Sequence, residues 1–176
     1  MKNILIGVTG GIAAYKAIEV VNALRKKGHN VRVVMTKSAQ EFIRPLTFQA
    51  ISGNQVITNM FDADDSSHIS HIELAKNADV FAIVPATANI IGKMASGIAD
   101  DMLSTIAMVV RCPSVIAPAM NTLMYENRIV QENIGKLKSR GFTVLDTDSG
   151  LLACGDTGKG KLLPWETIVA EIERFL

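Results

Sequence analysis

Short apolar runs alternate with helical patterns along the whole chain, and this alternation constrains the fold more than any other feature. Residues 3–9 are rich in branched side chains and predict a strand, and residues 12–27 predict a helix that ends at Gly28. Four further strands are predicted at residues 31–35, 79–85, 114–117 and 142–146. Strands that alternate with helices form βαβ units, in which helices cover both faces of a parallel sheet. The sequence therefore predicts a three-layer α/β/α, doubly wound parallel sheet of the flavodoxin-like or Rossmann-like class.

The segments between the strands complete this pattern. Helices are predicted at residues 38–43, 46–51, 71–76, 87–95, 100–110, 126–140 and 164–176. The polar stretch 53–70 has no clear period and predicts a surface loop, with one short strand at residues 55–58. Residues 148–163 are rich in glycine and predict a hairpin or flap. No linker or internal repeat interrupts the chain, so we expect one domain over residues 1–176.

Composition excludes several classes of function. Hydrophobic residues make up 48% of the 176 residues and charged residues 20%, which is typical of a globular protein with a sizeable core. The formal net charge is +1, and scattered lysines and arginines predict neither nucleic-acid nor membrane binding. No apolar run is long enough to span a bilayer, and we expect no signal peptide from residues 1–9. The two cysteines have no metal-ligand spacing, so we expect a reducing, cytoplasmic setting.

The turn after the first strand is a candidate phosphate site. Gly10, Gly11 and Ile12 lie between a strand and a helix, where backbone N–H groups can approach an anion. The turn lacks the GxGxxG pattern, and no acidic residue follows the second strand, so dinucleotide binding is disfavoured. Thr36 and Ser38 instead offer hydroxyls beside the same crevice, which suits a mononucleotide phosphate such as that of FMN. A plain tight turn remains the alternative.

The third and fourth strands end in segments suited to a flat ring and an acid. The third strand leads into small residues that leave room for a ring, namely Pro85, Ala86, Thr87 and Ala88. Thr87 could instead simply cap the next helix. Asn121 follows the fourth strand, at the edge where open α/β sheets bind ligands. Its amide can hold a carboxylate or an amide of a substrate, and Met124 supplies an apolar wall.

His71 and Cys154 are the candidate proton donors and acceptors. His71 heads a predicted helix, and neutral histidine is the usual general base near pH 7, although a capping role is the commoner one. His68 and His71 have helical spacing, but no cluster of ligands around them supports a metal site. Cys154 lies in the glycine-rich flap, where a thiol can donate a proton once the flap closes. A buried, inert cysteine is the alternative.

Taken together, these segments resemble the homo-oligomeric flavin-containing Cys decarboxylases. The resemblance covers nearly the whole chain and is carried by residues 10–16, 71–75, 85–89, 118–125 and 153–156, in the family order. It implies FMN as cofactor, His71 as the active-site histidine, Asn121 as the carboxylate anchor and Cys154 as the flap cysteine. It places the side chains of Ala86, Thr87, Ala88 and Ala119 along the flavin. Beside the substrate we expect Asn121, Met124, Ala153, Gly155 and Lys161.

The branch of the family that acts in coenzyme A biosynthesis is the most similar. This implies decarboxylation of 4'-phosphopantothenoyl-L-cysteine to 4'-phosphopantetheine. Loss of carbon dioxide needs an electron sink, and oxidation of the thiol to a thioaldehyde supplies one, so that an enethiol forms and is then reduced. The resemblance also implies a trimer or a dodecamer with active sites between subunits. The phosphopantothenate–cysteine ligase, which acts upstream and is fused to many bacterial relatives, is expected on another polypeptide or outside this segment.

Three alternatives remain. A peptidyl-cysteine decarboxylase of lantibiotic maturation stops at the enethiol and does not need the flap cysteine, so Cys154 disfavours it. A flavin prenyltransferase has a similar fold, but residues 118–125 favour the decarboxylase. A regulatory flavin-binding paralogue lacks complete sites and often carries long acidic tails, whereas this chain has His71, Asn121 and Cys154 and no such tail.

Overall fold

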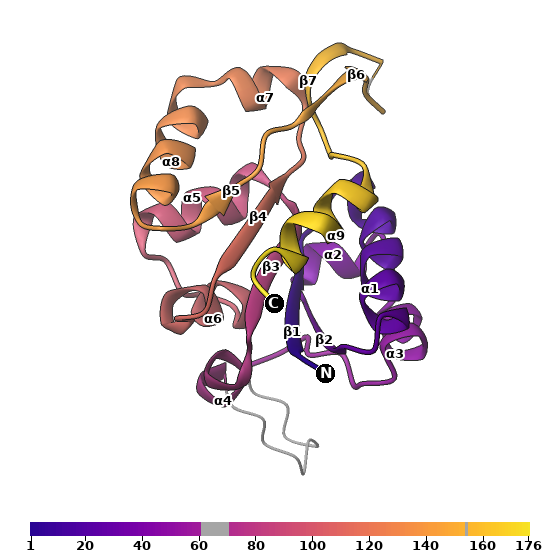
Figure 1. The fold of residues 1–176 in the computed structure, drawn as a ribbon. Coiled ribbons are helices and arrows are strands. Elements are labelled where there is room, and N and C mark those ends of the chain that lie inside the picture. The colour runs from indigo at the N-terminus through magenta and orange to yellow at the C-terminus, as the bar shows by residue number, and fades with distance from the viewer. Residues whose placement is uncertain (61–70, 154) are drawn as a thin grey trace.

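The core of the molecule is a parallel sheet with the strand order β2-β1-β3-β4-β5 (Figure 1). The computed structural model describes residues 1–60, 71–153 and 155–176. The strands are β1 (Asn3–Val8), β2 (Asn30–Met35), β3 (Val80–Ala86), β4 (Ser114–Pro118) and β5 (Thr143–Val144). This order reverses direction between β1 and β3, which creates a crevice at the carboxyl ends of these two strands. The predicted α/β/α fold is confirmed.

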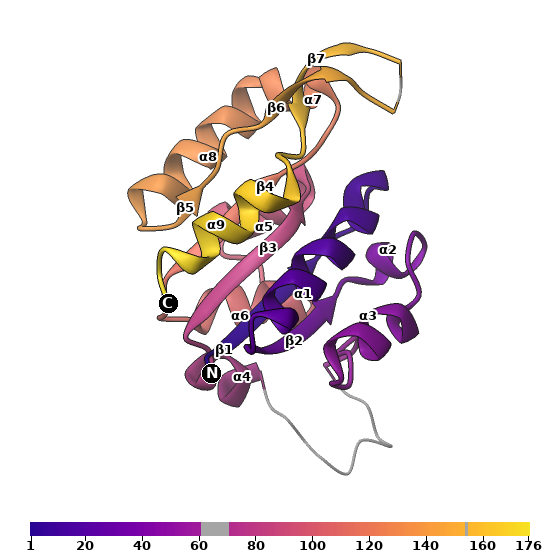
Figure 2. The same ribbon diagram turned by 45° about the vertical axis from the view of Figure 1, so that its right-hand side comes forward.

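Helices cover both faces of the sheet, as the views in Figures 1 and 2 show. One hydrophobic cluster packs α1 (Lys16–Lys26), α3 (Pro45–Ser52) and α9 (Trp165–Glu173) against the first face. A second cluster packs α4 (His71–Asn77), α5 (Ala88–Ser96), α6 (Met102–Val109) and α8 (Arg128–Ser139) against the other. The remaining short helices are η1 (Ile12–Tyr15), α2 (Lys37–Gln40) and α7 (Thr122–Glu126). None of the described helices is long and apolar enough to cross a membrane.

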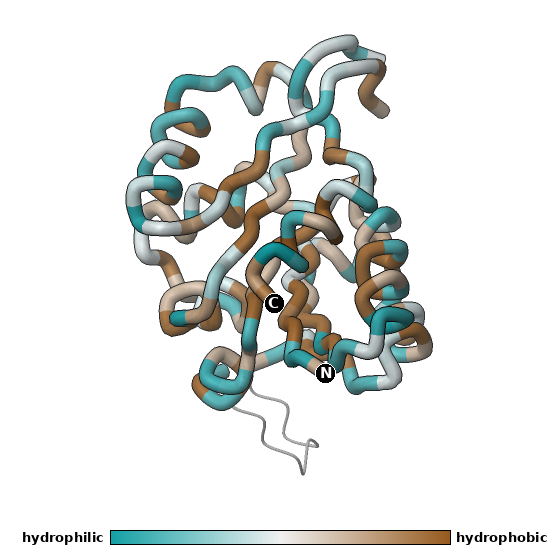
Figure 3. Tube along the Cα trace, viewed as in Figure 1, coloured by the Kyte–Doolittle hydropathy of each residue, from teal (hydrophilic) through white to brown (hydrophobic). Residues whose placement is uncertain are grey.

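Strand β1 shows how the sequence divides its side chains between the two faces. Ile4 and Ile6 pack into the first cluster and Leu5 into the second, because successive side chains of a strand point to opposite sides. Gly7 continues this alternation without a side chain: a Cβ there would lie 2.4 Å from a methyl group of Leu103 on α6. Figure 3 accordingly shows hydrophobic stretches along the central strands and a more polar hairpin beyond them.

The hairpin predicted from the glycine-rich segment is present. Strands β6 (Asp148–Leu151) and β7 (Thr157–Lys161) pair antiparallel and form a separate two-stranded sheet. Figures 1 and 2 place it beside α7, beyond the carboxyl end of β4. Here the backbone N–H of Met120 donates to the carbonyl of Gly160 (2.9 Å), and the Thr122 hydroxyl donates to the carbonyl of Lys159 (2.8 Å). These bonds anchor β7 to the segment that follows β4.

The local structure differs from the sequence-based expectations in three places. Residues 122–126 form their own short helix, because Asn121 and Asn127 each accept a backbone N–H and begin a new helix. The predicted strand at residues 55–58 is only a single bridge between Ile57 and Val34. Strand β5 is also shorter than predicted, with two residues. His68, the acidic residues at 62, 64 and 65, and Cys154 lie outside the described residues.

Candidate active site

A hollow of about 470 Å³ lies at the carboxyl ends of β1, β3 and β4. Ten of the residues predicted from the sequence line it, and they come from four separate segments of the chain. They are Gly10, Gly11, Ile12, Pro85, Thr87, Ala119, Asn121, Met124, Ala153 and Lys161. The structure therefore brings the glycine turn, the end of β3, the segment after β4 and the hairpin together around one cavity.

The glycine turn fits a bound phosphate or ring at close range. Gly10 packs directly on Ser38, since a Cβ at Gly10 would lie 2.4 Å from the Cβ of Ser38. A Cβ at Gly11 would have only one neighbour, the Thr87 methyl group at 3.9 Å, so the backbone of Gly11 faces open space. A ligand can therefore approach the main chain here without meeting a side chain. These contacts suit a mononucleotide such as FMN, whose flat ring needs small residues around it.

Asn121 has both ends of its amide engaged. Its Oδ1 accepts the backbone N–H of Leu123 (2.8 Å), which begins α7, and its Nδ2 donates to the Asp156 carboxylate of the hairpin (2.8 Å). Because Oδ1 is turned toward the helix, the donor end of the amide lies on the side of the hairpin. A donor in this position suits a carboxylate, which only accepts hydrogen bonds.

His71 lies at the other edge of the sheet from Asn121. It is the first residue of α4, and Figures 1 and 2 place α4 at the amino-terminal edge, whereas α7 and the hairpin lie beyond the carboxyl-terminal edge. His71 is half-buried and does not line the hollow. Within one chain, the structure does not bring His71 to the hollow that Asn121 lines.

Five other predicted residues lie outside the lining of the hollow. The Thr36 hydroxyl accepts the backbone N–H of Ala39 (3.2 Å) and begins α2, and Ser38 packs against Gly10. Ala86 is fully buried in the second cluster, Ala88 is half-buried at the start of α5, and Gly155 is exposed in the hairpin turn. Their proposed roles in binding stay predictions.

Tyr15 and Lys16 also line the hollow, although the sequence did not predict either as a site residue. Both follow the glycine turn, where the 3-10 helix η1 turns their side chains back toward the crevice. Their helical spacing after Gly11 was the available signal. Lys16 and Lys161 form no ion pair with other residues in the described part of the chain, so both cations can serve a ligand.

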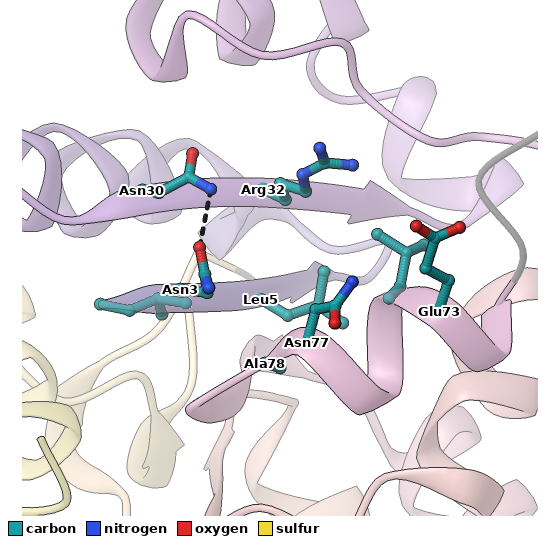
Figure 4. Close-up of a pocket in the computed structure, with 9 residues that line it drawn as sticks. Asn3, Leu5, Asn30, Arg32, Glu73, Asn77 and Ala78 are labelled. Atoms are coloured by element: carbon teal, nitrogen blue, oxygen red, sulfur yellow. Dashed lines mark hydrogen bonds between the residues drawn. The ribbon is translucent and has the colours of Figure 1, made fainter. Parts of the chain in front are cut away.

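A second, smaller hollow of about 190 Å³ lies at the amino-terminal edge of the sheet (Figure 4). Asn3 and Asn30 line it from adjacent strands and are joined by a hydrogen bond of 2.9 Å, while Glu73 and Asn77 lie on α4. None of the predicted site residues lines this hollow, so the candidate chemistry belongs to the larger one.

Comparison with known proteins identifies the family. The model of the family described as Flavoprotein matches residues 1–176. This chain belongs to the flavoprotein family. The flavoprotein is 46% identical over 177 residues to a Streptococcus mutans protein named "Probable phosphopantothenoylcysteine decarboxylase", with 99% of each chain covered. It is 47% identical over 174 residues to the Coenzyme A biosynthesis bifunctional protein CoaBC of Haemophilus influenzae, where it spans 99% of its own length but 44% of that protein. It thus spans less than half the length of the bifunctional relatives it matches.

Solved structures agree with this assignment. A mutant PPC decarboxylase complexed with pantothenoylaminoethenethiol has a TM-score of 0.85 and 29% identity, covering 99% of the flavoprotein and 97% of that chain. The FMN-dependent cysteine decarboxylase SpaF has a TM-score of 0.85 and 31% identity with the same coverage. The resemblance to flavin-containing cysteine decarboxylases drawn from the sequence is confirmed.

Proposed function

We propose that this flavoprotein uses FMN to decarboxylate 4'-phosphopantothenoyl-L-cysteine to 4'-phosphopantetheine in the cytoplasm, as a step of coenzyme A biosynthesis. The observation that carries the proposal is the meeting of three segments around one hollow: the glycine turn, Asn121 and the hairpin. The names of relatives at 46–47% identity support the same reaction. A phosphopantothenate–cysteine ligase would supply the substrate.

The glycine turn and the end of β3 would hold FMN, with Gly10, Gly11, Pro85, Thr87 and Ala119 against it. When bound, FMN supplies a ring that accepts a hydride from the cysteine side chain and later returns it. Asn121 would hold the substrate carboxylate through its amide donor and fix its orientation. Met124, which is 48% exposed at the mouth of the hollow, would lie against the apolar part of the substrate.

Lys16 and Lys161 would bind the substrate phosphate. They line the same hollow from opposite segments, Lys16 at the start of α1 and Lys161 at the end of β7. Two cations suit a phosphate group, which carries close to two negative charges near pH 7. The hairpin with Ala153 and Gly155 would close over the bound substrate and exclude water. Cys154 would then donate the proton that allows reduction to the saturated thiol.

A second copy of the chain would complete the site, because His71 lies at the edge of the sheet away from Asn121. Three apolar side chains at the rim of the hollow are more than half exposed, namely Ile12, Tyr15 and Leu151. Exposed apolar groups beside a pocket are typical of a surface that another protein covers. A homo-oligomer, such as a trimer or a dodecamer of four trimers, would cover them and bring His71 of one copy to the cavity of the next.

The test is a choice between two substrates. We expect the purified protein to be yellow, with flavin absorbance, and to release carbon dioxide from 4'-phosphopantothenoylcysteine but not from a peptide that ends in cysteine. Release from the peptide alone would replace the proposal with the peptidyl-cysteine reaction. Release from neither substrate by the flavin-loaded protein would support a regulatory role instead.

A further inference from the structure

Asp156 contacts the residue that the proposed function makes the carboxylate anchor. Its Oδ2 accepts a hydrogen bond of 2.8 Å from Nδ2 of Asn121, although the two residues are 35 positions apart. Asp156 is not among the site residues predicted from the sequence. Resting on the proposed function, we propose that Asp156 is a positioning residue, which fixes the donor end of the Asn121 amide so that the site selects a substrate with a carboxylate.

The two ends of the Asn121 amide have opposite hydrogen-bonding character and nearly the same size. The acceptor end, Oδ1, is paired with the backbone N–H of Leu123, and the donor end, Nδ2, is paired with a carboxylate that only accepts. If the amide rotated by half a turn, two donors would face each other at Leu123 and two acceptors would face each other at Asp156. Both partners therefore favour the same orientation.

The backbone of the hairpin holds Asp156 in place. The backbone N–H of Leu152 donates to the carbonyl of Asp156 (2.8 Å), and that of Gly155 donates to the carbonyl of Leu152 (2.9 Å), so the turn is closed on itself. Gly160 lies so close to the carbonyl of Met120 that a Cβ would leave only 2.4 Å between them. Strand β7 of the hairpin is thus anchored to the segment that carries Asn121, and Asp156 directly precedes this strand.

This arrangement connects closure of the hairpin with recognition of the carboxylate. In the observed position of the hairpin, the Asp156 carboxylate holds the donor end of the Asn121 amide on the side of the hairpin. If the hairpin moved away, the hydrogen bond from the Asn121 amide to Asp156 would be lost. We therefore expect Asp156 to affect binding of ligands that have the carboxylate and to leave ligands without it nearly unaffected, because Asp156 acts through Asn121.

The experiment compares two ligands of the FMN-loaded enzyme by titration calorimetry. The serine analogue 4'-phosphopantothenoyl-L-serine keeps the carboxylate but has no thiol to oxidise, and 4'-phosphopantetheine has lost the carboxylate. We expect Asp156→Ala to weaken binding of the serine analogue about tenfold and that of 4'-phosphopantetheine less than twofold, by analogy with loss of one charge-assisted hydrogen bond. Adding Asp156→Ala to Asn121→Ala should cause no further loss, because the two residues act as one unit.

Asp148→Ala is the matched control, since Asp148 is an acidic residue at the start of the same hairpin that does not line the hollow. It should bind both ligands like the wild type. Equal weakening of both ligands by Asp156→Ala would mean that Asp156 only stabilises the hairpin, and unchanged or tighter binding would mean that it does not assist Asn121. Either result overturns the inference. A wild type that binds neither ligand and releases no carbon dioxide would overturn the proposed function as well.

Discussion

The hydroxyl of Thr9 accepts the backbone N–H of Thr87 at 3.1 Å and donates to the carbonyl of Pro85 at 2.7 Å. Thr9 directly follows β1 and is 2% exposed, so one buried hydroxyl joins the ends of the two strands that form the crevice. Thr87 in turn accepts the backbone N–H of Ile90 and begins α5. The two walls of the proposed flavin site are therefore held at a fixed separation before any ligand binds.

Replacing Thr9 should damage the flavin site more than its size suggests. Thr9→Val keeps the shape but leaves the buried carbonyl of Pro85 and N–H of Thr87 without a partner, which costs about 1–3 kcal/mol. We expect a lower free energy of unfolding in urea and weaker FMN binding, measured by flavin fluorescence. Thr9→Ser keeps the hydroxyl and should behave much like the wild type. Equal FMN affinity in all three proteins would show that this link does not shape the site.

Glycines at two positions should respond to alanine in opposite directions. Gly160→Ala places a methyl group against the carbonyl of Met120, at a φ of 111° that side chains rarely adopt, so the hairpin anchor should be lost. Gly135 lies inside α8 with nothing within 4 Å, so Gly135→Ala should stabilise the protein by up to about 1 kcal/mol. Urea unfolding and proteolysis of the hairpin measure the two effects. Intact hairpins in Gly160→Ala would contradict the proposed anchoring.

Acid should remove a stabilising contribution of Asp101. Burial raises the pKa of this carboxyl, but hydrogen bonds from Ser104 and Lys93 outweigh the effect and hold the pKa below 3.8. Because the pKa is lower in the folded state, the charge stabilises the protein above pH 3.8, and this contribution is lost as the pH falls through the folded-state pKa.

Asp101→Asn isolates this charge, because asparagine is also a good first residue before a helix. Asp101 caps α6 and is partly exposed, so we expect the variant to be less stable at pH 7 by up to about 1 kcal/mol. The difference in free energy of unfolding should shrink as the pH falls below 3.8. A difference that stays constant down to pH 2.5 would show that the charge contributes nothing.

Two inactive variants should restore activity when they share an assembly. His71→Asn and Asn121→Ala should each abolish decarboxylation while retaining flavin absorbance. If each site takes His71 from a neighbouring copy, random assembly of the two coexpressed chains in a closed ring leaves about a quarter of the sites complete. We therefore expect about a quarter of wild-type activity from the mixture. A mixture as inactive as either variant would mean that both residues must come from one chain.

The sequence allowed prediction of the fold and of most of the cavity lining, because both depend on local patterns at strand ends. The position of Asn121 after β4 and of Thr87 after β3 follows from which residues are apolar and branched. Other features depend on contacts between distant segments, which no local pattern records. The bond between Asn121 and Asp156 is one of these, and the entry of Lys16 into the lining is another.

The separate helix α7 was missed for a different reason. The helix predicted at residues 126–140 is present as α8, but Asn121 begins an additional short helix before it, and Asn127 begins α8. The separation of His71 from Asn121 is the most consequential finding that the sequence did not predict. The alternation of strands and helices predicts that His71 begins the helix before β3 and that Asn121 follows β4. It does not predict how far apart the two residues lie, because that depends on the path of the chain before α4.

The mass of the product tests the central claim most directly. The wild type is incubated with 4'-phosphopantothenoylcysteine, and the product is analysed by mass spectrometry beside that of Cys154→Ser. We expect the wild-type product to be the saturated thiol, which is lighter than the substrate by one carbon dioxide. We expect the variant product to be the enethiol, which is lighter by two further hydrogens. A wild-type product that lacks those two hydrogens, or a variant that forms the saturated thiol at the wild-type rate, would contradict the account.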